Sequence, residues 1–496
     1  MIEYSRIDGY RENNRLEAKS ARGGLPKSIW QTYSAFANTS GGCILLGVDE
    51  NPDKSLSVSG LDDPGKLVAE IWSNANNSGK VSINVLREKH VRVVEAEGKQ
   101  IVEIEVPRAE RADKPVFLNN DIWNAYRRNG EGDFRCSKAS VKAMIRDSAN
   151  VTQDMLVLEK MPMTAIDYET VKGYRNVMRV TRVNHVWDSL DDDEFLFKLG
   201  AIGRSDDDKL SPTAAGILMF GFEHEIVREF PNFFLDYQEH FDEGLRWTDR
   251  ITSTSGEWSG NIFDFYKKAI NKLVQHPGIK KPFKVENGFR VDDTPVHVAL
   301  REALANCLIN SDYYGEAGVV IKSYSDRIAF ENPGCLRIRI EEAISGGISS
   351  PRNAVLMKMF NLLDIGERAG SGIPSIYSIW EAQQFGVPQL TERLHDFERV
   401  CLLLPIKSAD KKVPIKSADK KVPVKSAGKN GSGKSHAQKD LALKVIGEKG
   451  EVRSADLAVL LDVGERRARD ILAGLAGEGL IVADGSNRNR SYRPAE

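Results

Sequence analysis

Apolar and polar positions in the first 150 residues predict a mixed α+β domain. Residues 44–48 form a short continuous apolar run after a Ser-Gly-Gly turn, which is typical of a buried strand. Residues 101–106 alternate as a half-buried strand does, and residues 67–75 between them have apolar positions at helical spacing. Strand and helix patterns interleaved in this way indicate one α+β domain over residues 1–150.

A second informative pattern is a predicted helix over residues 297–310. It is apolar except for Glu302, Asn306 and Asn310, which recur every four residues and therefore share one helix face. We expect the apolar side to be buried and the polar stripe to line a pocket.

Two further features follow this helix within the predicted domain 291–404. Residues 326–334 predict a strand that ends in a turn, and residues 366–372 predict a glycine-rich loop that enters a helix. A glycine-rich loop at a helix N-terminus suits phosphate groups, because its backbone N–H groups point outward. Residues 151–290 are predicted to be a connecting α+β region.

A repeat marks the next boundary. The nine residues 405–413, Pro-Ile-Lys-Ser-Ala-Asp-Lys-Lys-Val, occur again unchanged at 414–422, and a third, altered copy follows. A proline every nine residues breaks a helix, and a lysine-rich register with little apolar area cannot bury a core. Residues 405–436 are therefore predicted to be a linker.

Residues 437–496 show three short helical patterns followed by a basic hairpin, the layout of a winged helix-turn-helix. In such a module the third helix faces a DNA groove and the wing reaches phosphates. The alternative is a winged helix used only for dimerisation. The basic residues predicted to contact nucleic acid are Arg466, Arg467 and Arg469 on the third helix and Arg488 and Arg490 on the wing.

Composition and charge change this picture in two respects. The chain of 496 residues has 69 Lys and Arg and 71 Asp and Glu, which gives a net charge of −2. Residues 405–496 hold 19 basic and 12 acidic groups, a net charge of +7, so residues 1–404 carry a net charge of −9. This asymmetry suggests a nucleic-acid-facing tail. No apolar run is long enough for a membrane helix, and five widely spaced cysteines predict a reducing, cytoplasmic setting.

Carboxylates near the N-terminus are candidate metal ligands. Glu12 and Glu17 lie five residues apart, and Asp49 follows the apolar run 44–48. If the segment around Glu17 pairs beside that strand, the three carboxylates converge, and Mg²⁺ or Mn²⁺ would relieve their repulsion. Such a site could activate water against a phosphodiester, with Lys19 opposing the developing charge. The alternative is that both glutamates are surface acids paired with neighbouring basic residues.

These residues resemble the divergent AlbA-type domain of the Schlafen family. The resemblance runs through Glu12, Glu17-Ala18-Lys19, residues 34–39, Gly41-Gly42 and Gly47-Val48-Asp49. It implies that Glu12, Glu17 and Asp49 hold the metal of an RNA endonuclease, although Ala18 replaces the usual Phe and Glu50 could substitute for Asp49.

The segment 126–130, Tyr-Arg-Arg-Asn-Gly, also resembles the Schlafen family. It is independently typical of a basic, aromatic strand end that binds phosphates through Arg127 and Arg128. The alternative is an ordinary surface hairpin.

The features of residues 291–404 resemble the GHKL ATPase fold, an α/β sandwich often fused behind Schlafen-type domains in bacteria. The resemblance implies that Glu302 positions a water molecule, that Asn306 holds Mg²⁺ and that Asn332 replaces the aspartate that recognises adenine. Leu336 stands where the adenine-binding box has its second glycine. The ATP-binding residues predicted in this way are Asn306, Asn310, Asn332, Gly334, Arg352, Gly370, Ser371 and Gly372.

Three functions are compatible with these patterns. The first is an ATP-binding, nucleic-acid-binding regulator that binds DNA. The second is a metal-dependent RNA or DNA endonuclease gated by ATP and acting in stress or phage defence, with weak ATPase activity. The third is a non-catalytic scaffold. A homodimer is expected by analogy with winged-helix proteins.

Overall fold

The structure is a computed structural model. It describes residues 4–242, 244–279, 284–286, 289–291, 294–366, 370–394 and 398–406, and in the C-terminal part residues 442, 452–453, 456–457, 468, 472, 475–476, 481–484 and 491–494. The chain forms two compact units, Met1–Lys412 and Val413–Glu496, and each is described by itself.

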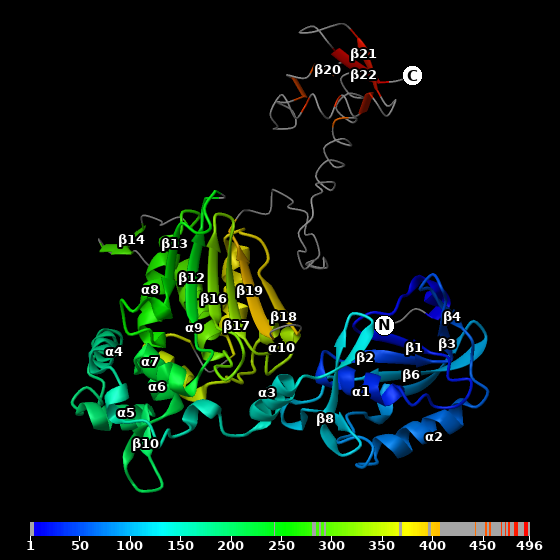
Figure 1. Ribbon diagram of the computed structural model, residues 1–496, viewed down its shortest axis with the longest axis horizontal. Coiled ribbons are helices and arrows are strands. Elements are labelled where there is room, and N and C mark those ends of the chain that lie inside the picture. Colours follow the sequence, from blue (N-terminus) through cyan, green and yellow to red (C-terminus); the bar gives the residue numbers. More distant parts are fainter. Residues whose placement is uncertain are drawn as a thin grey trace. The chain divides into compact units, whose positions relative to one another are not determined.

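The N-terminal domain is built on a four-stranded sheet (Figure 1). The strand order is β1 (Leu16–Lys19), β2 (Gly42–Leu46), β6 (Lys99–Val106) and β5 (Val91–Ala96). Helices α1 (Ile29–Asn38) and α2 (Pro64–Ala75) pack on one face, because their apolar residues share a core with Ile44 of β2 and Ile104 of β6. The predicted strands and the predicted helix of this domain are confirmed.

The other face of this sheet has its own apolar cluster, which joins Leu16 and Leu45 to the short pair β3 (Val48–Glu50) and β4 (Leu56–Val58). A second hairpin system follows along the chain. Its elements are β7 (Phe117–Leu118), β8 (Asp121–Asn129), β9 (Gly132–Arg135) and the helix α3 (Lys138–Ser148).

A helical region comes next. It contains α4 (Tyr168–Thr181), α5 (Asp192–Leu199), α6 (Ala214–Phe220) and α7 (Glu223–Glu229), with the hairpin β10 (Ile202–Arg204) and β11 (Leu210–Pro212) between α5 and α6. Helix α5 begins at Asp191, whose carboxylate accepts a hydrogen bond from the backbone N–H of Glu194, so the acidic run at 191–193 serves as a helix start.

The largest sheet has six strands. Their order is β13 (Asp249–Thr252), β12 (Leu235–His240), β16 (Val319–Tyr324), β17 (Arg327–Pro333), β19 (Arg399–Pro405) and β18 (Gln389–Arg393). Two of these strands precede residue 291, so the predicted domain boundary at that position cuts through the sheet. A small hairpin, β14 (Lys284–Glu286) with β15 (Phe289–Val291), lies between them and the later strands in sequence.

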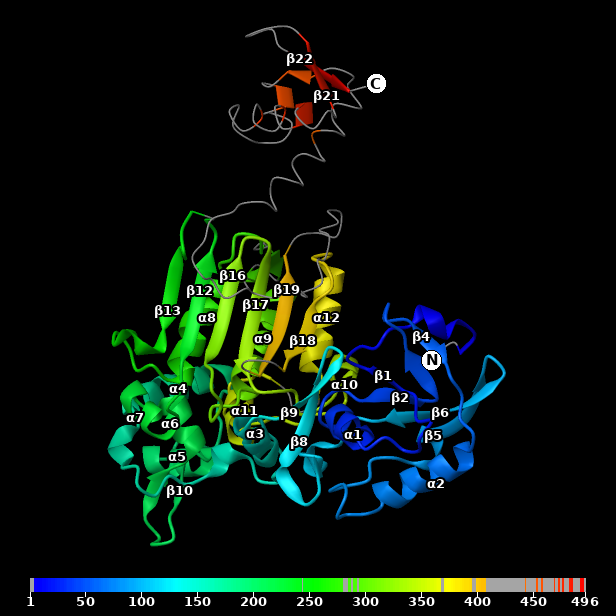
Figure 2. The same ribbon diagram turned by 45° about the vertical axis from the view of Figure 1, so that its right-hand side comes forward.

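Helices cover one face of the six-stranded sheet (Figure 2). They are α8 (Ile262–Leu273), α9 (Pro295–Ile309) and α12 (Gly372–Ala382), while α10 (Ile340–Ser345) and α11 (Ala354–Leu362) complete the domain. Burial alternates along β16 and β19, as expected for a sheet with one covered face. The predicted helix 297–310, the strand 326–334 and the helix entered at the glycine loop are confirmed as α9, β17 and α12.

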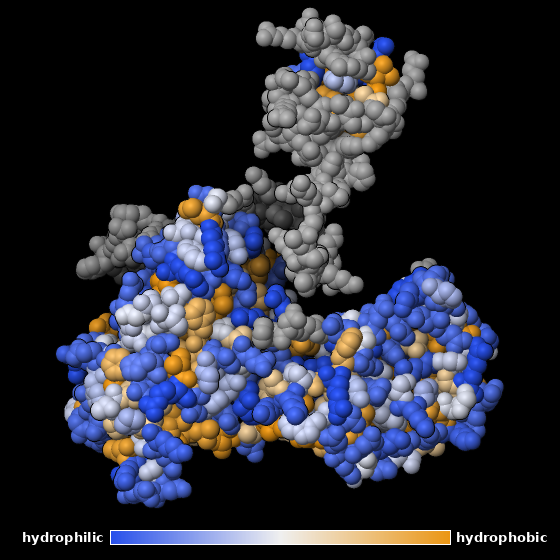
Figure 3. Space-filling view, viewed as in Figure 1, coloured by the Kyte–Doolittle hydropathy of each residue, from blue (hydrophilic) through white to orange (hydrophobic). Residues whose placement is uncertain are grey.

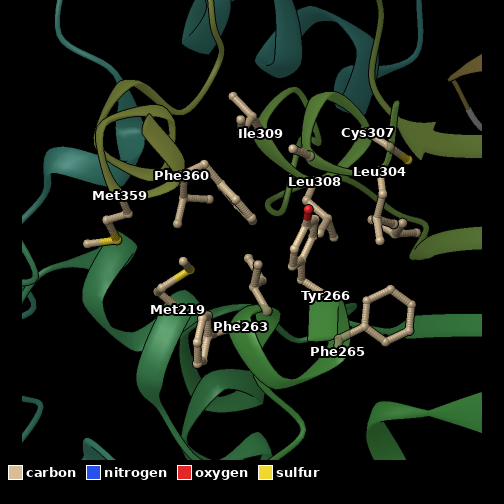
Figure 4. Close-up of a cluster of buried hydrophobic side chains, with 14 of the residues drawn as sticks. Met219, Phe263, Phe265, Tyr266, Leu304, Cys307, Leu308, Ile309, Met359 and Phe360 are labelled. Atoms are coloured by element: carbon tan, nitrogen blue, oxygen red, sulfur yellow. The ribbon is translucent and has the colours of Figure 1, made fainter. Parts of the chain in front are cut away.

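One continuous core joins the helical region to this sheet (Figure 4). Met219 of α6, Phe263 and Tyr266 of α8, Leu304 of α9 and Phe360 of α11 belong to the same buried cluster. The rings of Tyr266 and Phe360 lie edge to face with centroids 5.2 Å apart. Because α9 is anchored on its apolar side in this core, its polar stripe is held in a fixed position.

Hydrophilic residues dominate the visible surface of the N-terminal domain, whereas apolar patches are more frequent around the helical region (Figure 3). Within the described part of the chain, no helix combines the length and the apolar character needed to cross a membrane.

The C-terminal unit contains a three-stranded antiparallel sheet. Its order is β20 (Val452–Arg453), β22 (Ser491–Pro494) and β21 (Ile481–Asp484). A buried cluster joins this sheet to helical positions, including Leu457, Leu472 and Leu475. The predicted basic hairpin therefore has the expected strands. The residues proposed to contact DNA here, Arg466, Arg467, Arg469, Arg488 and Arg490, lie outside the described residues.

Candidate functional site: a polar pocket on helix α9

The polar stripe of α9 opens into a pocket. The helix begins after Thr294, whose hydroxyl accepts a hydrogen bond from the backbone N–H of His297, and Pro295 occupies its first turn. Glu302, Asn306 and Asn310 all line the pocket, as the four-residue spacing predicts. The amide of Asn306 donates to Glu302 Oε1 at 3.0 Å, and the amide of Asn310 donates to the backbone oxygen of Asn306 at 3.0 Å.

The glycine-rich loop closes one side of this pocket. Gly370 has φ +67°, a conformation that favours glycine, and Ser371 precedes the first turn of α12. A Cβ on Gly372 would lie 2.1 Å from Glu302 Oε1 and 2.9 Å from Asn306 Nδ2. The loop backbone can therefore approach the carboxylate and the amide only because no side chain intervenes.

Strand β17 supplies the opposite wall. Asn332 is buried on this strand, and its amide donates to the backbone oxygen of Asn310 at 3.4 Å. Gly334 follows with φ +93° at the end of the strand, and Leu336 also lines the pocket. A Cβ on Gly334 would lie 2.5 Å from Arg352 Nη1, so this glycine makes room for an arginine.

Arg352 borders the pocket, but its guanidinium is engaged elsewhere. Its Nε and Nη2 donate to the two carboxylate oxygens of Asp147 at 2.9 and 2.7 Å, and Nη1 donates to the backbone oxygen of Asn310 at 2.6 Å. The side chain is only 9% exposed. The expectation that Arg352 binds ATP directly is therefore corrected: its charge is neutralised by Asp147, and the arginine fixes the end of α9 against α3.

In the N-terminal domain, the strand pairing that the metal site would require is present. Strand β1 runs parallel to β2, with Glu17 opposite Ile44. The carboxylates themselves are already partnered. Glu12 accepts a hydrogen bond from the backbone N–H of Ala18 at 2.9 Å, Glu17 pairs with Lys19 at 2.6 Å, and Asp49 pairs with Arg22.

Across the residues that the structure describes, no three or more His, Cys, Asp or Glu side chains are grouped so that they could hold a metal ion. The expected metal set of Glu12, Glu17 and Asp49 is therefore not assembled in this arrangement, because two of the three carboxylates form ion pairs with basic side chains. Burial raises the pKa of Glu12, and the charges of Glu17 and Glu50 raise it further. Glu50, the alternative third carboxylate, is therefore close enough to Glu12 for its charge to raise the pKa of Glu12.

The two arginines expected to bind nucleic acid on β8 are buried. Arg128 is 1% exposed and pairs with Glu17 at 2.8 Å and with Asp133 at 3.0 Å. Arg127 is 10% exposed and forms an ion pair with Glu398. Neither can reach a phosphate on a bound duplex without breaking these pairs. Their role in nucleic-acid binding stays a prediction, and in this arrangement both side chains form buried ion pairs inside the fold.

Sequence reasoning missed a set of contacts between the N-terminal domain and the rim of the pocket. Arg108 donates to the backbone oxygen of Leu336 at 2.7 Å and to Glu392 at 3.2 Å. The thiol of Cys335 donates to Glu398 at 3.1 Å beside Arg127. The partners of Arg108 and Arg127 lie more than 200 residues away in the chain, and no local pattern could have linked them.

Three protein-family models match parts of the chain. Residues 12–137 match "Schlafen, AlbA_2", residues 142–236 match a domain of unknown function, and residues 316–401 match "Putative ATP-dependent DNA helicase recG C-terminal". Among curated proteins there is no match.

Two solved structures are similar. The DIP2311 protein from Corynebacterium diphtheriae is 15% identical over 97% of this chain and 94% of its own, with a TM-score of 0.37. The N-terminal domain of a protein titled "Putative ATP-dependent DNA Helicase RecG-related Protein" from Nitrosomonas europaea is 26% identical over 28% of this chain and 95% of its own, with a TM-score of 0.21.

Proposed function

The chain carries a Schlafen AlbA_2 domain followed by a domain of the type described at the C-terminus of RecG, and on this premise we propose that it is an ATP-binding, nucleic-acid-binding regulator that binds DNA. The observation that carries the proposal is the approach of Gly372 to Glu302 and Asn306 on the polar face of α9. A carboxylate, an amide and a bare helix N-terminus in one pocket are suited to a nucleotide and its phosphates.

In this proposal each pocket residue has a role set by its chemistry. Gly370, Ser371 and Gly372 contact the phosphates through backbone N–H groups, and Asn306 offers an amide oxygen to Mg²⁺. Glu302 accepts a hydrogen bond from Asn306 and orients water near the terminal phosphate. Asn332 and Asn310 lie on the opposite side, where an amide can recognise the base. The ion supplies charge neutralisation when it is bound.

In this proposal, ATP binding is coupled to the N-terminal domain through the rim of the pocket. Leu336 lines the pocket and its backbone oxygen accepts a hydrogen bond from Arg108 of the N-terminal domain. A nucleotide that moves this rim changes the seating of the N-terminal domain. The basic C-terminal unit then contacts DNA, and ATP adjusts the relation between the domains.

The alternative function, an endonuclease gated by ATP, has one supporting observation. The pKa of Glu12 is raised by burial and also by the neighbouring charges of Glu17 and Glu50, so carboxylates do gather near β1. The ion pairs of Glu17 with Lys19 and Arg128 count against a metal there. A scaffold with neither activity is the remaining alternative and predicts no binding of ATP.

The experiment that tests the regulator is a DNA-binding titration of the full chain with and without ATP and Mg²⁺. We expect binding of duplex DNA whose affinity changes when ATP is added. Cleavage of DNA or RNA in the same tubes would favour the endonuclease. Absence of DNA binding under both conditions would contradict the proposal.

A further inference from the structure

A second, smaller cavity lies where the N-terminal domain meets the strands of the six-stranded sheet. It has a volume of about 40 Å³ and is distinct from the nucleotide pocket, although Cys335, Leu336 and Arg337 border both. A water-sized sphere needs roughly 10–15 Å³, so the space suits a group of a few heavy atoms.

The walls of this cavity are rich in positive charge. Five basic residues line it, namely Arg108, Arg111, Lys114, Arg127 and Arg337. Three acidic residues, Asp147, Glu392 and Glu398, also line it, which leaves an excess of two positive charges in a buried space. Such an excess is costly unless a counter-charge is present.

The acidic residues are committed to particular arginines. Glu398 pairs with Arg127, Glu392 pairs with Arg108, and Asp147 pairs with Arg352 outside this cavity. Lys114 has no carboxylate partner among the described residues, and its ammonium donates only to the backbone oxygen of Asn38 at 3.1 Å. Arg111 and Arg337 likewise form no ion pair among the described residues and donate to backbone oxygens, so the excess charge lies on these two arginines and on Lys114.

Two further donors in the same walls are unsatisfied. The Nε atoms of Arg127 and Arg337 are buried and have no hydrogen-bond partner among the residues that the structure describes. Arg127 as a residue is 8% exposed, so water does not replace the missing acceptor easily. Buried donors without acceptors cost about 1–3 kcal/mol each, and more when the group is charged.

We propose that this cavity is a binding site for a small tetrahedral oxyanion, of the size and charge of inorganic phosphate or sulfate, held by Lys114, Arg127 and Arg337. One such anion supplies acceptors for the ammonium and for the two free Nε–H groups and cancels the excess charge. The site joins Lys114 and Arg127 of the N-terminal domain to Arg337 beside the nucleotide pocket. The proposal stands independently of ATP binding.

The protonation of Lys114 follows from its surroundings. Burial, together with the charges of Arg108 and Arg127, lowers its pKa to about 7, although Cys335 and Glu392 act in the opposite direction. A bound dianion favours the charged ammonium, so binding takes up a proton above pH 7. Affinity for an anion of constant charge should therefore be highest below about pH 7 and fall as the pH rises.

The test is a thermal-melting and calorimetric titration of the full chain with sulfate at matched ionic strength, with chloride as the balancing salt. Sulfate keeps its charge over the pH range used. We expect sulfate and phosphate to raise the melting temperature, and the variant Lys114→Met to bind them at least about tenfold more weakly, as for loss of one charge-assisted hydrogen bond.

Lys114→Met also separates binding from misfolding. Without anion, this variant should melt at or above the wild-type temperature, because it removes an unpaired buried charge. The matched control Lys142→Met changes an exposed lysine of α3 and should leave the sulfate effect unchanged. Between pH 6 and 9 the wild-type affinity for sulfate should fall, and that of Lys114→Met should not.

Three results would overturn the proposal. The first is an equal effect of chloride and sulfate at matched ionic strength, which would indicate general screening. The second is retention of sulfate binding in Lys114→Met. The third is binding of AMP at this site more tightly than of phosphate, which would make the ligand a nucleotide and not a free anion.

Discussion

Arg352 and Asp147 form a bidentate ion pair, with Nε–Oδ1 at 2.9 Å and Nη2–Oδ2 at 2.7 Å, between the edge of the pocket on α9 and α3. Burial alone would raise the pKa of Asp147, but the charge and hydrogen bonds of Arg352 outweigh it and hold that pKa below its ordinary value. This pair is thus a structural contact that fixes the pocket edge against the helix that leaves the N-terminal domain.

Replacing Arg352 should destabilise the protein. Arg352→Met leaves the Asp147 carboxylate buried without its partner, which typically costs about 3–5 kcal/mol. Arg339→Met is the matched control, because the Arg339 side chain is 61% exposed and its pair with Glu342 should be worth less than about 1 kcal/mol. Denaturant unfolding measures both. Equal small losses in the two variants would contradict this account.

The same pair sets a dependence on pH. Because the folded-state pKa of Asp147 is lowered, its stabilising contribution is present above the unfolded value of about 3.9 and is lost as the pH falls through the folded value. Stability should therefore fall below about pH 4, and less steeply in Asp147→Asn than in the wild type. Parallel curves for the two proteins would show that Asp147 does not contribute.

A methyl group on the glycine loop should close the pocket. In Gly372→Ala the added Cβ would lie 2.1 Å from Glu302 Oε1, so the loop or the carboxylate must move. We expect the affinity for ATP to fall by about tenfold or more and stability to drop by about 1–3 kcal/mol. Gly23→Ala is the control, since its Cβ meets nothing within 4 Å. Unchanged ATP binding in Gly372→Ala would place the nucleotide elsewhere.

Glu17 should contribute to the stability of the fold through its ion pair with Arg128. Its carboxylate pairs with Arg128, which is 1% exposed, so Glu17→Gln weakens the neutralisation of a buried cation. We expect a loss of about 1–3 kcal/mol in unfolding free energy. Glu131→Gln, at a side chain 53% exposed, should have little effect. A Glu17→Gln protein of full stability that had lost a metal-dependent nuclease activity would instead support the endonuclease.

The C-terminal arginines are expected to carry the salt dependence of DNA binding. Replacing Arg466, Arg467 and Arg469 by alanine should weaken binding to all duplexes, and each lost phosphate contact should reduce the slope of affinity against salt by about 0.9. Replacing Arg488 and Arg490 tests the wing in the same way. An unchanged slope in both variants would mean that DNA contacts another surface.

Local patterns predicted the parts of the fold that depend on local physics. The four-residue spacing of Glu302, Asn306 and Asn310 is a property of a helix, and the structure places all three in one pocket. The apolar run 44–48 predicted a buried strand, and the structure forms strand β2 (Gly42–Leu46) there. Each of these inferences used only residues close in sequence or a periodicity.

Long-range contacts could not be predicted in this way. Arg127 meets Glu398 across 271 residues, and Arg352 meets Asp147 across 205. A basic residue in an aromatic strand has the same sequence pattern whether it faces a phosphate or a buried carboxylate, so the sequence alone did not predict the carboxylate partners of Arg127 and Arg128. Strands β12 and β13 likewise belong to the large sheet because β12 pairs with β16, which lies about 80 residues later in the chain.

The most direct test of the central claim is a calorimetric titration of the full chain with ATP and Mg²⁺. We predict one site, with affinity reduced at least about tenfold in Asn306→Ala, where the amide beside Glu302 is lost. The control Asn176→Ala, at an exposed position of α4, should bind as the wild type does. Absence of ATP binding by the wild type, or equal binding by Asn306→Ala, would contradict the assignment of this pocket.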